Sequence, residues 1–369
     1  MAGRSGAGGG LSSGGSDGVS PTPTTPTTHS CDTLPAAGTF ENINPPGITY
    51  QNFAFAVDPN NAGVVYVGTD KHKIWKTSDC GATWAVIDTG RNAAAIDGGI
   101  NWTLLVDPQD PKVLYTNAGY GTNLGYKSVN GGVDWDVVWP PPDGTLADVV
   151  AYNFANVFAI DPLDHQHLLL TFHGECKAPY TASCIGETKD GGATWRLANG
   201  DPKMVGTEGQ VIYFLDTSHT WIWGSQSSDF WRTEDSGATW TKISPAIKEA
   251  HPQGSQIYRA KDGTFYLAAS DGVSKSRDGK AWSLVANTGP LGGGLVGDGT
   301  TMYLSNNFYW NWGKDLHPYF SAPESSGEPW TPLAGSPGLT AGGSLGLDTV
   351  HHVLYSSNLG AGVWRAVLP

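Results

Sequence analysis

Histidine, tyrosine and carboxylate side chains lie close to short apolar runs along this 369-residue chain. An imidazole titrates near neutral pH and can abstract a proton, whereas a pair of carboxylates can share the acid and base roles of glycoside hydrolysis. The candidate catalytic residues chosen on this basis are His72, His173, Tyr258, Asp70, Glu175 and Glu208.

Candidate substrate-binding residues lie in the same parts of the chain. Aromatic rings stack on the C–H face of a sugar, while amides and charged groups bond its hydroxyls. The set comprises Lys71, Arg91, Asn101, Trp102, Tyr120, Gln210, His251, Tyr309, Trp310 and Trp312. Alternatively, Trp310 and Trp312 pack only against their own long loop. We expect no metal and no cofactor, because the His residues of DHQHLLLTFHG lie at opposite ends of one strand.

A turn motif of the form Thr-x-Asp-x-Gly-x-Thr-Trp recurs along the chain. Near-complete copies occupy 77–84, 128–135, 188–195 and 233–240, with a shortened copy at 276–282 and a worn one around 324–330. Its Asp can accept hydrogen bonds from its own turn, its Gly can adopt a positive φ, and its Trp can pack between sheets. A structural carboxylate is needed in every repeat and a catalytic one only once, so we interpret these Asp residues as structural.

A second repeat is an apolar run that ends in Asp and a turn, after which another apolar run begins. The Asp positions are Asp58, Asp107, Asp161, Asp216, Asp262, Asp298 and Asp348. Short, continuously apolar runs are typical of strands that are buried on both faces. Seven units of about 50 residues with four strands each predict an all-β, seven-bladed β-propeller over 39–369. The last unit lacks the turn motif, and we expect residues 43–50 to supply its outer strand.

The predicted strand order places the loops on two faces of the ring. The tight Asp hairpins and the repeated turns share one face, where His165, His167, His351 and His352 are expected to have no functional role. The blade connections and all long insertions open on the other face, which is where function is usually placed.

Residues 1–38 are rich in Gly, Ser, Pro and Thr and predict a disordered tail. Such a linker is typical of exported proteins, so we expect a secreted or surface-tethered form whose signal peptide is absent from this sequence. Cys176 and Cys184 enclose a loop that a disulfide could staple, whereas the pairing of Cys31 with Cys80 stays open.

Composition excludes several classes of protein. A net charge of −13 with only 7 Arg argues against a nucleic-acid binder. No stretch approaches the roughly 20 apolar residues of a membrane span. A Gly-rich chain with 15 % charged residues is neither a coiled coil nor a helical solenoid. We expect a monomer that takes a polysaccharide or oligosaccharide as its partner.

The turn motif resembles the Asp-box of the sialidase-type BNR repeat, whose propellers include sialidases, xyloglucan hydrolases, polysaccharide lyases and lectins. A typical sialidase is disfavoured, since its Arg-Ile-Pro segment is replaced here by NINPPGITYQN. The segment GTDKHKIWKTSD is similar to xyloglucanase-type propellers, which implies that Asp70 stands where that family has one carboxylate. In that family the partner carboxylate lies in a second propeller, so Glu175, Glu208 or Asp97 would have to serve here.

The expected function is therefore cleavage of an extracellular polysaccharide by one of two chemistries. A hydrolase would use paired carboxylates, whereas the resemblance to propeller lyases implies a His or Tyr base acting on a uronate. The alternative is a non-catalytic lectin. Multivalent lectins repeat their sugar site in each blade, and the differing loops of this chain favour one specialised pocket.

Overall fold

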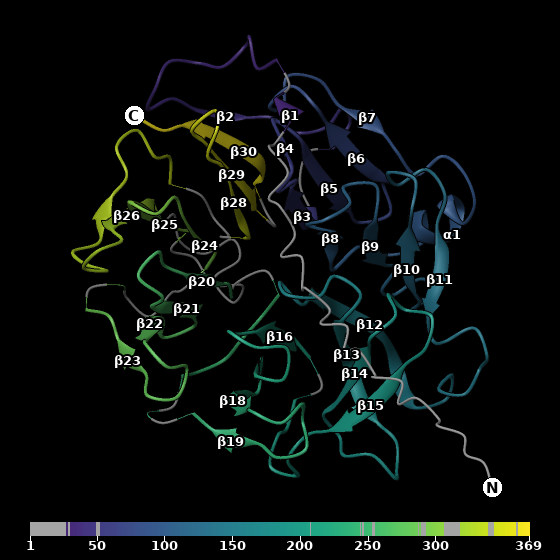
Figure 1. Ribbon diagram of the computed structural model, residues 1–369. Coiled ribbons are helices and arrows are strands. Elements are labelled where there is room, and N and C mark those ends of the chain that lie inside the picture. Colours follow the sequence, from purple (N-terminus) through teal and green to yellow (C-terminus); the bar gives the residue numbers. More distant parts are fainter. Residues whose placement is uncertain are drawn as a thin grey trace, which may run out of the picture.

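The structure is a computed structural model, and it describes residues 27–28, 30–48, 52–206, 208–243, 245, 247–252, 255–286, 288, 293–305, 318–338, 343–358 and 361–369. Seven four-stranded antiparallel sheets surround a common axis (Figure 1). The predicted all-β, seven-bladed propeller is confirmed. Most of the predicted tail, 1–26 and 29, lies outside the described residues. No helix in the described part is long and apolar enough to span a membrane.

The first four blades follow one another along the chain, each from its inner to its outer strand. Blade 1 contains β3 (Asn52–Val57), β5 (Val65–Thr69), β6 (Ile74–Thr77) and β7 (Ala85–Val86). Blade 2 contains β8 (Leu104–Val106), β9 (Leu114–Asn117), β10 (Gly125–Ser128) and β11 (Asp136–Trp139). Blade 3 contains β12 (Val150–Ile160), β13 (Leu168–Cys176), β14 (Cys184–Thr188) and β15 (Arg196–Asn199). Blade 4 contains β16 (Val211–Phe214), β17 (Trp221–Ser225), β18 (Ser228–Thr233) and β19 (Thr241–Lys242).

The remaining blades complete the ring. Blade 5 contains β20 (Ile257–Arg259), β21 (Phe265–Ala269), β22 (Gly272–Ser276) and β23 (Ser283–Leu284). Blade 6 contains β24 (Leu295–Gly297), β25 (Thr301–Ser305), β26 (Tyr319–Pro323) and β27 (Thr331–Pro332). Blade 7 contains β28 (Leu345–Asp348), β29 (Val353–Asn358), β30 (Gly362–Val367) and, from the start of the chain, β2 (Phe40–Asn42). A short helix, α1 (Ala93–Asp97), lies between blades 1 and 2.

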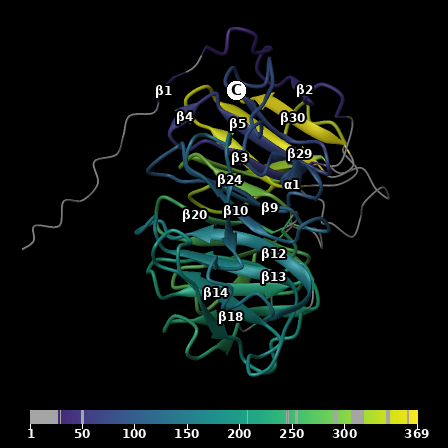
Figure 2. The same cartoon turned by 90° about the vertical axis from the view of Figure 1, so that its right-hand side faces the viewer.

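The strand that closes blade 7 is β2, a few residues earlier than the predicted 43–50. Phe40, Glu41 and Asn42 pair with β30. The strand cannot continue through Pro45-Pro46-Gly47, because Pro has no N–H to donate and Gly47 has a φ of 79°. Figures 1 and 2 both place β29 and β30 of the last blade beside β3 and β5 of the first.

The repeated turn bonds to itself and to the inner hairpin of the same blade. In blade 1, Asp79 Oδ1 accepts hydrogen bonds from Thr77 Oγ1 (2.7 Å) and the Thr83 amide (2.9 Å). The Cys80 amide donates to the Gly63 carbonyl in the inner hairpin. Equivalent amide-to-hairpin bonds join Gly131 to Lys112, Gly191 to Gln166 and Ser236 to His219. The turns and hairpins therefore form one regular face.

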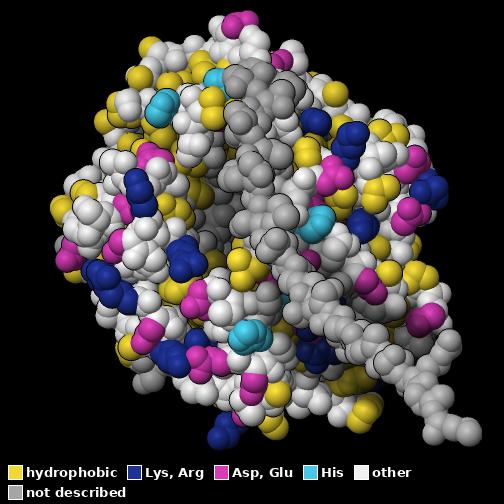
Figure 3. Space-filling model, in the orientation of Figure 1, with side chains coloured by type: hydrophobic (Ala, Val, Ile, Leu, Met, Phe, Trp, Pro, Cys, Tyr) yellow, Lys and Arg dark blue, Asp and Glu magenta, His cyan; other side chains and the backbone are white. Residues whose placement is uncertain are grey.

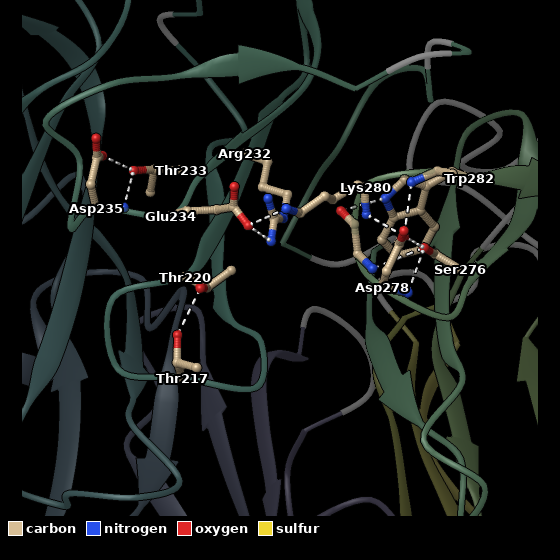
Figure 4. Close-up of polar contacts among 12 residues, drawn as sticks. Thr217, Thr220, Arg232, Thr233, Glu234, Asp235, Ser276, Asp278, Lys280 and Trp282 are labelled. Carbon is tan, nitrogen blue, oxygen red and sulfur yellow. Dashed lines mark hydrogen bonds and ion pairs between the residues drawn. The ribbon is translucent and has the colours of Figure 1, made fainter.

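Blades 4 and 5 are also joined by an ion pair beside their turns. Arg232 and Lys280 approach Glu234 Oε1 at 2.8 and 2.7 Å (Figure 4). The shortened turn of blade 5 lacks the second Thr of the motif. There, Asp278 accepts hydrogen bonds from the amides of Lys280 and Ala281 instead.

Two disulfides are present among the described residues. Cys176–Cys184 joins the end of β13 to the start of β14. Cys31–Cys80 joins the segment before β2 to the repeated turn of blade 1. Buried Arg365 reinforces this closure, since it pairs with Glu41 and donates to the Thr33 and Cys80 carbonyls.

Acidic and basic side chains are interspersed around the rim of the face drawn in Figure 3. The described surface of this face carries no continuous basic patch.

Candidate functional site

Five side chains from different blades meet on the face of the blade connections. They are Trp102, Tyr120, Phe154, His173 and His251, referred to below as the aromatic–histidine cluster. Trp102 lies at the centre, with ring centroids 5.9–6.4 Å from the other four. Trp102 precedes β8 of blade 2 and His251 precedes β20 of blade 5, so this contact crosses the axis of the ring. Three of the five, Trp102, Tyr120 and His251, were predicted to bind substrate, and His173 was predicted to be catalytic.

The strands and one glycine position these rings. Phe154 and His173 are register partners on β12 and β13, and their rings stack with centroids 4.6 Å apart. A side chain at Gly119 would have its Cβ 2.6 Å from Trp102 and 2.8 Å from Phe154. Glycine at this position therefore allows both rings to approach the backbone. Tyr120 follows at once and is 54 % exposed, so its ring borders solvent.

The histidines of the cluster are neutral near pH 7. Burial lowers the pKa of His173, against the opposing influence of the Glu208 carboxylate. Burial together with His173 lowers the pKa of His251 to about 3. Tyr120 Oη lies 3.2 Å from His173 Nε2, within hydrogen-bonding distance.

A second polar group follows β5 in blade 1. Asp70 forms a bridge with Ile100 and has a buried Oδ1 without a hydrogen-bond partner among the described residues. Ile100 also bridges to Gly119, so one backbone segment connects Asp70 to the cluster. Lys71 has a φ of 59°, and both Lys71 and His72 are exposed.

An acid pair lies beneath this loop. Lys73 Nζ is 2.5 Å from Asp97 Oδ2 on α1. Asp97 is in turn a neighbour of fully buried Asp88, and burial with this like charge raises the pKa of Asp88 to about 8. Asp97 therefore holds the loop of Asp70 in place through its ion pair with Lys73.

The other predicted residues do not meet in this cluster. Asn101 is buried and donates to the Asn117 carbonyl (2.7 Å), and Gln210 is buried and donates to the Gly206 carbonyl (2.9 Å). Tyr258 donates to Glu324 (2.6 Å) between blades 5 and 6, and Arg91 pairs with Asp136.

Two predicted carboxylates are accessible on the same face, and three predicted rings cannot be placed. Glu175 on β13 and Glu208 before β16 are exposed. Tyr309, Trp310 and Trp312 lie outside the described residues.

Sequence reasoning missed Phe154 and Asp88. Phe154 lies within an apolar strand and has the pattern of an ordinary core residue. Asp88 belongs to no recognisable motif, and its neighbour Asp97 was considered only as one of three candidates for the second carboxylate. Register pairing with His173 could have pointed to Phe154, whereas nothing in the sequence marks Asp88.

An apolar cavity of about 420 Å³ lies elsewhere in the ring. It is lined by inner strands of blades 1, 2 and 7, including Val57, Leu105 and Leu347, and reaches the Asp58 and Asp348 hairpins. It belongs to the hairpin face, opposite the aromatic–histidine cluster.

No family model matches this chain. A xyloglucanase from a Paenibacillus species is 27 % identical over 217 residues, which is 52 % of this chain and 21 % of that protein.

Among solved structures, the GH74 enzyme of Niastella koreensis matches with a TM-score of 0.63 and 19 % identity. The GH74 xyloglucanase of Xanthomonas campestris matches with a TM-score of 0.62 and 17 % identity. Each match covers 89 % of this chain and 53 % of the other chain. A virginiamycin B lyase from Staphylococcus aureus has a TM-score of 0.59 at 12 % identity.

The chain thus spans about a fifth of the curated relative and about half of the GH74 structures. At these identities the structural likeness shows the propeller fold alone.

Proposed function

We propose that this protein is a secreted glycoside hydrolase that binds a neutral polysaccharide across the aromatic–histidine cluster. The cluster is the observation that carries the proposal. Exposed Tyr120 and half-buried Trp102 offer rings to a sugar, and the neighbouring acids are available for bonds to its hydroxyls. The partial similarity to a xyloglucanase supports the same substrate class.

The reaction requires a carboxylic acid to protonate the leaving oxygen and a carboxylate to act as base or nucleophile. Among the candidates, Asp70 has a buried carboxylate oxygen without a partner in the described part of the chain, and its backbone is linked to the cluster through Ile100, so we assign it the acid role. Glu208, whose charge acts on His173, and Glu175 are the exposed carboxylates that remain for the second role. Asp97 is not assigned this role, because it lies on α1 outside the cluster and its Oδ2 pairs with Lys73.

A lyase is the second candidate, and the contact of Tyr120 with a neutral His173 favours it. A neutral imidazole can accept the proton next to a uronate carboxyl group. That chemistry also needs a cation to neutralise the uronate, and exposed Lys71, next to Asp70, is the candidate for that role. The partial similarity to a xyloglucanase ranks the hydrolase first.

The test is incubation of the full chain with xyloglucan, other neutral glucans and uronate-containing polysaccharides. Reducing ends and the ultraviolet absorbance of an unsaturated uronate are read in parallel. We expect reducing ends without new absorbance on a neutral glycan. New absorbance would establish the lyase instead, and glycan retention without cleavage would leave a lectin.

Variants connect the activity to the site. Asp70→Asn is expected to reduce kcat at least about 100-fold, since acid–base groups contribute roughly 10²–10⁴-fold. Trp102→Ala is expected to weaken polysaccharide binding, because stacked aromatic contacts contribute roughly 0.5–1.5 kcal/mol beyond the area they bury. Leu163→Ala is the matched control, since Leu163 is 64 % exposed on the opposite face. Equal loss in all three variants would contradict the assigned site.

A further inference from the structure

The disulfide Cys31–Cys80, which closes the ring covalently, has the imidazole of His351 beside it. Ligand atoms of Cys31, Cys80 and His351 all lie within 4.8 Å of one another. Among the described residues, this is the one group of three such side chains with that spacing. The three come from the segment before β2, the turn of blade 1 and the hairpin of blade 7, so they surround the point where the ring closes.

The orientation of His351 is the one that metal-binding histidines adopt. Its Nδ1 lies 2.8 Å from Oδ2 of Asp348, a carboxylate that is almost fully buried. A carboxylate at one ring nitrogen sets the tautomer and leaves Nε2 as the free ligand atom. Asp348 Oδ2 also accepts a hydrogen bond from the Gly63 amide, and the Gly63 carbonyl accepts one from Cys80. His351 and Cys80 are thereby held in a fixed relation through one carboxylate and one peptide unit.

We propose that Cys31, Cys80 and His351 form a zinc-type metal site when the disulfide between the two cysteines is reduced. A dithiol supplies two electrons and two protons and is itself oxidised to a disulfide; a phosphine supplies the two electrons and becomes its oxide, with the oxygen and the two protons coming from water. Either reductant converts Cys31–Cys80 into two thiols. Binding of a divalent cation then releases the two thiol protons and forms two metal–sulfur bonds and one metal–nitrogen bond. Water completes a tetrahedral shell.

The dimensions of the group suit this assignment. Zinc binds sulfur at about 2.3 Å and imidazole nitrogen at about 2.0–2.1 Å, which separates tetrahedral ligand atoms by roughly 3.3–3.8 Å. The imidazole of His351 already lies within 4.8 Å of both sulfurs, and the two sulfurs, which are bonded to each other here, have to separate to about 3.8 Å once reduced. Two soft sulfurs and one imidazole select zinc over magnesium or calcium. The closure would be held by a disulfide under oxidising conditions and by a metal under reducing ones.

The experiment uses the full chain, reduced with a phosphine and titrated with Co²⁺ as a visible substitute for Zn²⁺. We expect a thiolate-to-cobalt charge-transfer band that saturates at one equivalent, and displacement of the cobalt by Zn²⁺. The oxidised protein should show no such band. The second disulfide is removed by Cys176→Ser with Cys184→Ser, so that only one thiol pair remains.

Two histidine variants provide the decisive comparison. His351→Ala should weaken Co²⁺ binding at least 10-fold, whereas His165→Ala should leave it unchanged. His165 is matched, because its Nδ1 lies 2.8 Å from Asp107 on another hairpin of the same face. Both oxidised variants should still form Cys31–Cys80, as judged by thiol titration.

Several outcomes would overturn the site. Equal binding by the His351→Ala and His165→Ala variants would remove the imidazole from it. A band retained in Cys31→Ser at full intensity would place the thiolates elsewhere. Where the reduced protein unfolds, recovery of its near-ultraviolet circular dichroism on addition of Zn²⁺ supports the site, and failure to recover contradicts it.

Discussion

The imidazole of His173 stacks on the phenyl ring of Phe154, with 4.6 Å between ring centroids and 16° between ring planes. This pair connects an inner strand to the proposed substrate face, because Phe154 is fully buried while the Tyr120 ring above His173 reaches solvent. A charged imidazole would lose much of its hydration in this position. This stacked arrangement is therefore more stable when His173 is neutral.

Acidification should destabilise the aromatic–histidine cluster. The pKa of His251 falls from its ordinary value near 6.5 to about 3 in the folded state. The stability that neutral His251 preserves is complete above pH 6.5 and is lost as the pH falls toward 3, by roughly 1 kcal/mol per pH unit. Urea unfolding at pH 7.5, 6 and 5 should show a steeper loss for wild type than for His251→Gln. Parallel pH profiles would assign the loss to other groups.

His167 should have the opposite pH dependence. Its nitrogens lie 2.9 Å from Asp161 and 2.8 Å from Glu187, and these bonds raise its pKa against the effect of burial. Its contribution is complete below pH 6.5 and is lost as the pH rises through the raised pKa. His167→Gln should therefore cost about 3–5 kcal/mol at pH 6 and less at pH 9, measured by urea unfolding.

The control for this prediction is His165→Gln. His165 bonds one carboxylate, Asp107, and its side chain is 31 % exposed. Asp107 is buried but His165 keeps contact with water and bonds only this one carboxylate, so the control should lose less stability than His167→Gln at pH 6. A larger cost of His167→Gln at pH 9 than at pH 6 would reverse the assigned sign.

Asp88→Asn should stabilise the protein in alkaline solution. Burial and the neighbouring Asp97 raise the pKa of Asp88 to about 8, so wild type loses stability as the pH rises from about 4 through 8. Asparagine keeps a donor toward Asp97 and cannot ionise. We expect the variant to gain a few kcal/mol over wild type at pH 9 relative to pH 5, by urea unfolding. Asp143→Asn, in an exposed loop, should show no such gain.

The two disulfides should differ in their contribution to stability. Loss of Cys31–Cys80, with a sequence separation of 49, should cost about 4 kcal/mol from loop-closure entropy. Loss of Cys176–Cys184, with a separation of 8, should cost about 2–3 kcal/mol. Urea unfolding of the two Cys→Ser double variants under oxidising conditions tests this order. A greater cost for the shorter loop would show that local strain or packing outweighs chain entropy.

Much of the fold could be predicted because its signals are local. The Asp79 carboxylate accepts hydrogen bonds from residues within four positions of itself, so eight consecutive residues determine this turn. The same holds for Asp107, which accepts from the amides of Gln109 and Asp110. The closing strand was misplaced because pairing of Phe40 with Ala366 is set by the far end of the chain.

The site was predictable only in part. Residue type and loop position identified Trp102, Tyr120, His173 and His251, yet the same criteria also selected Asn101, Gln210 and Tyr258. Those three bond to neighbours that belong to the scaffold, and no local pattern distinguishes them from the cluster.

The sequence by itself determined the number of blades, the repeated turns and the face on which the insertions lie. These follow from hydrogen bonds and apolar runs within short windows of the chain. Only the tertiary structure decided that Trp102 at the entry to blade 2 meets His251 at the entry to blade 5. Closure of the ring brings these segments across the axis, and burial by other blades then sets which histidines stay neutral.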